Sequence, residues 1–84
     1  MQFDYAPRFK KQFRNLPLDI RERAGKQLAL LLENPQHPSL RLHKMEGYAN
    51  MWEISVTINY RIVFQIEGDK YILFKIGSHD ILKK

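Results

Sequence analysis

The sequence predicts an α+β fold, with two N-terminal helices packed on a twisted, mainly antiparallel sheet of four or five strands. Two observations predict it. Residues 7–32 place apolar side chains three and four positions apart, as helices do, whereas residues 51–76 change to the alternation of strands. Because the two periods occupy separate halves of 84 residues, we expect two layers in a single domain spanning residues 1–84.

The first half is expected to form a helical hairpin. After Pro7, the side chains of Phe9 and Phe13 share one helical face, with basic residues between them. Pro17 suits the first position of a second helix, and residues 34–38 (NPQHP) end it because proline removes a hydrogen-bond donor. The apolar stripe of the second helix is Ile20, Ala24, Leu28, Leu31 and Leu32.

In the second half and at residues 2–5, polar and apolar residues alternate or apolar residues form short runs, as in strands. The last strand is apolar on both faces, as expected of a strand that is covered on both sides. Residues 67–70 (EGDK) form a turn that joins the last two strands as a hairpin. The predicted strands are residues 2–5, 41–45, 51–58, 60–66 and 70–76.

The length of the hairpin loop decides which side chains share a face. A two-residue loop at residues 68–69 pairs Ile66 with Tyr71, whereas a three-residue loop pairs Glu67 with Tyr71. Only the three-residue loop, or a β-bulge, places the candidate functional residues of these strands on one face. Those residues are Arg61, Lys75 and His79.

Charge and composition limit the possible partners and cofactors. Lys and Arg outnumber Asp and Glu by 14 to 9, which favours a polyanionic partner such as nucleic acid or an acidic protein segment. The chain has no cysteine, and its three histidines lack the short spacing of a metal site, so we expect neither a metal nor another cofactor. No segment has the length of a membrane span or the apolar run of a signal peptide, so a soluble, cytoplasmic protein without a membrane partner is expected.

Most catalytic motifs are absent, and one kind of chemistry remains open. There is no glycine-rich phosphate loop, no metalloprotease helix and no nucleophile elbow. A basic face with histidine and arginine can cleave RNA without a metal. In that reaction the 2′-hydroxyl attacks the adjacent phosphate, histidine transfers protons, and arginine stabilises the phosphorane.

The segment NYRIVFQIEGDKYILFKIGSHD, residues 59–80, resembles the C-terminal half of the RelE/ParE superfamily of toxins from type II toxin–antitoxin pairs. The shared pattern is a Y-R-I-V-F strand, a short turn, and an apolar strand that ends in glycine with a basic residue or histidine just after it. The G-S-H-D sequence is similar to the RelE/StbE-like branch. That branch implies an mRNA interferase, an endoribonuclease that inhibits translation by cutting mRNA in the ribosomal A site. The implied partners are a cognate antitoxin, the ribosome and mRNA.

The resemblance also implies roles for individual residues. Arg61 falls on the strand arginine that contacts the scissile phosphate, and His79 falls on the proton-transfer position after the last strand. His43 lies near a further catalytic histidine of some members, and we expect it to act as a base. The expected RNA-binding residues are Lys44, Arg41, Lys75, Tyr60 and Asn59.

A non-catalytic alternative stays open. Glu53, Ser55 and Thr57 occupy a strand where strongly active members carry basic residues, and Arg61 could pair with Glu53 across the strands. The chain could then be a ParE-like inhibitor of gyrase, or a degenerate toxin that only binds its antitoxin. The odd-to-even register with Arg61 buried against Glu53 would favour this second interpretation. A cleft shared by Arg61 and His79 beside Lys44 or Lys75 would favour catalysis.

Overall fold

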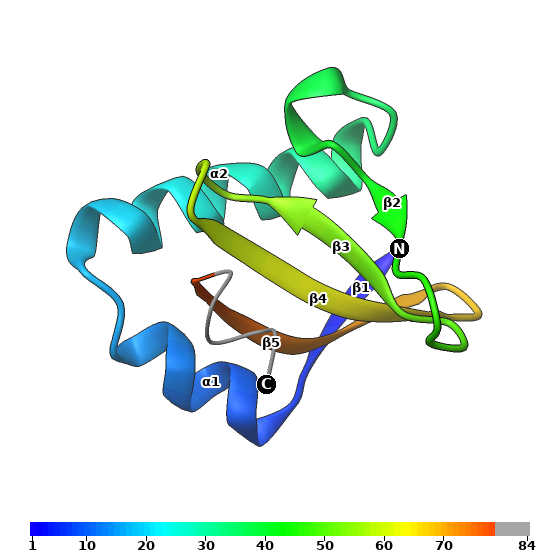
Figure 1. The fold of residues 1–84 in the computed structure, drawn as a ribbon, viewed down its shortest axis with the longest axis horizontal. Helices are drawn as coiled ribbons and strands as arrows, with labels where there is room; N and C mark the ends of the chain where they lie inside the picture. The colour runs from blue at the N-terminus through cyan, green and yellow to red at the C-terminus, as the bar shows by residue number, and fades with distance from the viewer. Residues whose placement is uncertain (79–84) are drawn as a thin grey trace.

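The computed structural model describes residues 1–78 and confirms the predicted α+β class (Figure 1). Both predicted helices and all five predicted strands are present, although two of the strands are shorter than expected. The elements are β1 (Gln2–Tyr5), α1 (Pro7–Arg14), α2 (Leu18–Glu33), the 3-10 turn η1 (Pro38–Leu40), β2 (His43–Lys44), β3 (Trp52–Ser55), β4 (Tyr60–Glu67) and β5 (Lys70–Ser78).

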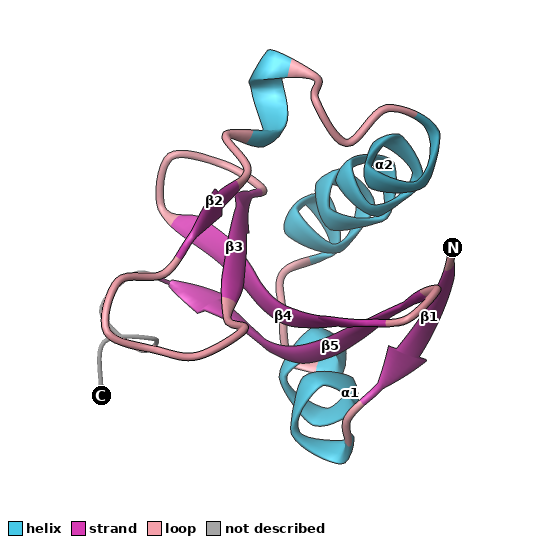
Figure 2. Ribbon diagram, turned by 90° about the vertical axis from the view of Figure 1, so that its right-hand side faces the viewer, coloured by secondary structure: helices cyan, strands magenta, loops and turns pink. Residues whose placement is uncertain are grey.

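The five strands form one sheet in the order β1-β5-β4-β3-β2. Strand β1 pairs with β5 in parallel, and every other neighbouring pair is antiparallel, as predicted. Both helices pack on the same side of the sheet, so the molecule has two layers (Figure 2). Within residues 1–78, no helix covers the opposite side of the sheet.

The core lies between the helices and the sheet. Phe64 at the centre of β4 is fully buried, and its ring meets Tyr71 of β5 edge to face with ring centroids 5.3 Å apart. Leu32 was predicted in the core stripe of α2, but its side chain is 44% exposed. The buried core cluster consists of Phe9, Ala24, Leu28, Leu31, Leu40, Ile54, Val56, Ile62, Phe64, Tyr71, Leu73 and Ile76.

The hairpin between β4 and β5 combines a two-residue loop with a β-bulge. Ile66 pairs with Tyr71, so the loop is residues 68–69, and Gly68 has a φ of 60° that a side chain would strain. One extra residue, Phe74, then enters β5, because Phe64 pairs with Leu73 but Val63 pairs with Lys75. Beyond the bulge, odd-numbered residues of β4 meet odd-numbered residues of β5.

Strand β3 ends earlier than the alternation predicted. The expected strand reached Ile58, but the structure ends it at Ser55, and Ile58 is 79% exposed. The Oγ1 of Thr57 accepts hydrogen bonds from the backbone N–H groups of Asn59 and Tyr60, each at 3.2 Å, which closes a turn. A threonine hydroxyl thus ends the strand inside an apolar run.

Within residues 1–78, neither helix is long and apolar enough to span a membrane.

Candidate functional site

The sheet side opposite the helices brings candidate residues together from four strands. Directly paired residues share a face, and one such row runs from His43 to Glu53, on to Val63, and then to Lys75. Arg61 is two positions from Val63 on β4 and therefore lies on the same side. We call His43, Glu53, Arg61 and Lys75 the charged face.

The β-bulge makes this grouping possible despite the short hairpin loop. Arg61 is paired directly with Gly77, and Val63 with Lys75. Without the extra residue at Phe74, the two-residue loop would turn Lys75 toward the helices. His79, the predicted proton-transfer residue that follows β5, lies outside the described residues.

Arg61 is held by its own turn and by a carboxylate. Its Nη1 donates to the carbonyl oxygens of Thr57 at 2.5 Å, Ile58 at 3.0 Å and Tyr60 at 3.3 Å. Its Nε lies 3.6 Å from Oε1 of Glu53, and the side chain is 18% exposed. Among residues 1–78, Nη2 has no hydrogen-bond partner, so these two N–H groups are available to a ligand.

His43 contacts the same carboxylate oxygen from the other side. Its Nδ1 lies 2.8 Å from the carbonyl oxygen of Arg41, and because a carbonyl only accepts, Nδ1 carries hydrogen and donates. Nε2 is then the atom that gains or loses a proton, and it lies 3.4 Å from Oε1 of Glu53. Since the His43 side chain is 55% exposed, Nε2 is accessible to a substrate.

Glu53 is the residue whose importance the sequence reasoning missed. Its side chain is 12% exposed, and its Oε1 lies between His43 Nε2 and Arg61 Nε. The sequence suggested a pair between Arg61 and Glu53, which the structure confirms, but it gave Glu53 no part in a site. The signal that could have identified Glu53 is the alternation of polar and apolar residues in its strand, which places Glu53 on the same side of the sheet as Arg61.

Two predicted RNA-binding cations lie away from the charged face. Lys44 pairs with Trp52, which packs against the core, so Lys44 leaves β2 on the side opposite to His43. Arg41 was expected in the same strand as Lys44, but it follows η1 and lies outside β2. Its backbone has a φ of 49°, a left-handed conformation that is strained for a residue with a side chain.

The two remaining candidates directly precede Arg61 in the chain. Tyr60 is half-buried, and its side chain packs against the core on the side opposite to Arg61. Asn59 is exposed in the turn between β3 and β4. Neither residue is brought onto the charged face, so among the predicted residues within residues 1–78 His43, Arg61 and Lys75 are the ones that gather there.

Residues 1–78 contain no group of three or more histidine, aspartate or glutamate side chains that could hold a metal ion. The chemistry that the charged face can offer is proton transfer at His43 Nε2 and anion binding by Arg61 and Lys75. Lys75 also lies over an aromatic ring, with its Nζ 5.7 Å from the ring centroid of Phe74.

Sequence comparisons relate the chain to toxins. The family described as "ParE toxin of type II toxin-antitoxin system, parDE" matches residues 3–82. The "mRNA interferase toxin RelE" of Escherichia coli strain K12 is 30% identical over 75 residues, which cover 88% of this chain and 76% of RelE. The matches therefore include both branches of the superfamily.

Solved structures share the fold. YafQ from Escherichia coli strain BL21(DE3) superposes with a TM-score of 0.83 at 13% identity, over 98% of this chain and 97% of YafQ. A toxin–antitoxin complex, the intact Escherichia coli RelBE complex, matches with a TM-score of 0.72 at 25% identity, over 90% of this chain and 93% of the matched chain.

The fold and the relatives define the class of this protein as the toxin component of a toxin–antitoxin pair. The chain belongs to the RelE/ParE superfamily.

Proposed function

We propose that this toxin is an mRNA interferase, a metal-independent endoribonuclease that cuts mRNA in the ribosomal A site and acts in the cytoplasm. The observation that carries the proposal is the pair of contacts on Glu53, whose Oε1 lies 3.4 Å from His43 Nε2 and 3.6 Å from Arg61 Nε. A proton-transfer group and a phosphate-binding group therefore stand side by side. The 30% identity to RelE over most of the chain supports the same activity.

The proposed mechanism uses Nε2 of His43 and Nη2 of Arg61. Nε2 of His43 takes the proton of the attacking 2′-hydroxyl, and Glu53 stabilises the imidazolium that forms. The two N–H groups on Nη2 of Arg61 bind the phosphate and the charge that develops on it. His79 remains our predicted general acid for the leaving 5′ oxygen. Lys75 adds positive charge, and Lys44, Arg41, Tyr60 and Asn59 remain predicted RNA contacts outside the charged face.

The test is induced expression with mapping of transcript ends. Wild type should arrest growth and produce new internal mRNA ends, and His43→Asn should reduce those ends by about 10²-fold, because general base catalysis contributes 10²–10⁴-fold. His79→Asn should do the same if that residue is the acid. His37→Asn is the matched control, since His37 only caps η1 through Nδ1 and asparagine can also cap. Arrest without new ends would contradict the proposal.

A second candidate is a ParE-like inhibitor of gyrase or a toxin that only binds its antitoxin. The observation that favours it is the engagement of Arg61, whose side chain is largely buried against Glu53 and three carbonyl groups. An arginine so occupied has a sufficient structural role without any substrate. Growth arrest with intact transcripts and inhibited supercoiling would identify the gyrase inhibitor.

Whether the toxin is a nuclease or a non-catalytic inhibitor, its proposed partner is an antitoxin. The antitoxin would bind an apolar groove between α1, α2 and β1. The groove has a volume of about 740 Å³, and Lys10 and Arg14 add positive charge to its lining. Exposed Tyr5 and Leu32 offer apolar surface there. An amphipathic antitoxin segment with acidic side chains complements both features. The apolar lining is Phe3, Tyr5, Phe9, Phe13, Leu28 and Leu32.

Replacing Leu32 by glutamate should weaken antitoxin binding by about 10- to 100-fold, because a charge would enter the apolar groove and repel acidic side chains. Leu18→Glu is the matched control, since Leu18 is also an exposed leucine of α2 but lies outside the groove. Calorimetric titration with the antitoxin encoded beside the toxin measures both. Equal affinities of the two variants would place the antitoxin elsewhere.

A further inference from the structure

A basic cavity lies where α2, η1 and the end of β3 meet, and Ser55 in its lining is the direct strand partner of Arg61 on β4. It has a volume of about 480 Å³, within the range of roughly 300–1,000 Å³ that is usual for small-molecule sites. Its cations come from two elements, Arg23 and Lys26 from α2 and Arg41 from the end of η1, and no acidic residue among residues 1–78 lines it. We call it the α2 pocket.

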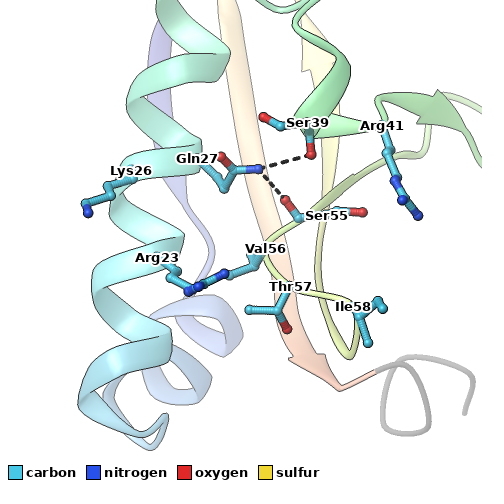
Figure 3. Close-up of a pocket in the computed structure, with 9 residues that line it drawn as sticks. All are labelled: Arg23, Lys26, Gln27, Ser39, Arg41, Ser55, Val56, Thr57 and Ile58. Carbon is cyan, nitrogen blue, oxygen red and sulfur yellow. Dashed lines mark hydrogen bonds between the residues drawn. The ribbon is translucent and has the colours of Figure 1, made fainter.

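The α2 pocket is braced by the half-buried side-chain amide of Gln27. Nε2 of Gln27 donates to the carbonyl oxygen of Ser55 at 2.9 Å and to that of Ser39 at 3.3 Å, which ties α2 to β3 and η1 (Figure 3). Arg23 extends from α2 toward Val56, whereas Lys26 points away from the strands. The guanidinium of Arg23 is therefore the cation that α2 directs into the pocket.

The same backbone segments support the α2 pocket and the charged face. Thr57 and Ile58 line the pocket, and their carbonyl oxygens accept the hydrogen bonds from Arg61 Nη1. Arg41 also lines the pocket, and its carbonyl oxygen holds the ring of His43. An anion in the α2 pocket would thus lie behind the groups that position both candidate catalytic side chains.

We propose that the α2 pocket binds a backbone phosphate of RNA, through Arg23 and Arg41, next to the nucleotides that occupy the charged face. This rests on the proposed function, because it takes RNA as the partner of that face. Guanidinium groups bind phosphate with paired donors, and the hydroxyl groups of Ser55 and Thr57 in the lining can donate to the remaining phosphate oxygens. The strained backbone of Arg41, with a φ of 49°, is the conformation that places this side chain at the pocket.

The experiment measures binding of a 2′-O-methyl oligouridylate, which cannot be cleaved, by fluorescence anisotropy over a range of salt concentrations. Arg23→Gln should weaken binding by about tenfold at low salt, because it removes a charged hydrogen bond. It should also reduce the slope of log K against log salt by about 0.7, the value for one phosphate contact on a single strand. Arg23→Lys should retain the slope, because the charge remains. Lys11→Gln, which removes an exposed cation of α1, should leave both quantities unchanged.

Several outcomes would overturn the proposal. Equal losses for Arg23→Gln and Lys11→Gln would mean that only net charge matters, and no loss for Arg23→Gln would mean that RNA does not reach the pocket. In a parallel titration followed by NMR, RNA should shift the side-chain amide signal of Gln27. A shift with inorganic phosphate but not with RNA would make the pocket a site for a free anion. Because the oligonucleotide is uncleavable, these results do not depend on whether the toxin is a nuclease.

Discussion

Replacing Arg61 by lysine is expected to lower RNA cleavage by about 10²-fold or more while the protein stays folded, because loss of one donor to a developing oxyanion has effects of that size. Lysine carries all its donors on one nitrogen, whereas Arg61 holds the turn with Nη1 and can direct a separate nitrogen, Nη2, to a phosphate. The yield of new transcript ends at equal concentrations of folded protein measures the effect. Lys11→Arg, the reverse exchange at an exposed cation, should cleave like wild type.

Removing the whole side chain of Arg61 should also lower the free energy of unfolding, by more than the exchange for lysine does. Arg61→Ala leaves three carbonyl groups without this donor and Glu53, 12% exposed, without its arginine, so we expect a loss of about 2–4 kcal/mol in the free energy of unfolding. Adding Glu53→Gln should recover part of that loss, because no unpaired carboxylate remains. Full cleavage by a stable Arg61→Lys variant would make Arg61 structural and favour the non-catalytic reading.

The helices and the sheet could be predicted because burial imposes a period on the sequence. Phe9, Ala24, Leu28 and Leu31 recur at helical spacing, and all four are buried. The alternation of β4 likewise identified Ile62 and Phe64 as core residues. These patterns follow from one-sided burial, which the chain cannot avoid in a two-layer fold.

The charged face could be predicted only in part. Which residues lie on it depends on places where a strand departs from its two-residue alternation. The bulge at Phe74 changes the spacing of the buried residues of β5 from two, between Tyr71 and Leu73, to three, between Leu73 and Ile76. Because nearly every residue of this run is apolar, the sequence does not show where the spacing changes. The sequence therefore left open whether Arg61 and Lys75 share a face. A bulge is set by pairing across strands, and no single segment specifies it.

The prediction that Arg41 lies in a strand was wrong for a similar reason. A short run of alternating residues at 41–45 predicted one strand, but only His43 and Lys44 pair with β3. Arg41 instead takes a left-handed backbone conformation after η1, which few non-glycine residues adopt. Its tertiary surroundings, with the carbonyl group bonded to His43, support a conformation that local preference disfavours.

Replacing Phe64 by alanine should have the largest effect on stability, a loss of about 3–5 kcal/mol, as for other buried phenylalanines. Phe64 is fully buried at the centre of β4, the middle strand of the sheet, and it meets Tyr71 edge to face. A domain of 84 residues has a total stability of roughly 4–13 kcal/mol, so this loss is a large fraction of the total. Urea denaturation measures the loss. Phe64→Leu, which preserves most of the apolar volume, should lose less than about 1.5 kcal/mol.

A second measurement separates the loss of packing from a general effect of mutation. Burial raises the pKa of the Tyr71 phenol above its ordinary value. In Phe64→Ala the phenol loses the ring that covers it, so its pKa should move back toward that value in the molecules that remain folded. Tyr48→Ala, at a residue 60% exposed, should change neither this pKa nor the stability by more than about 0.5 kcal/mol. An unchanged Tyr71 pKa and a loss below 1.5 kcal/mol would mean that the core between β4, β5 and the helices is looser than its packing indicates.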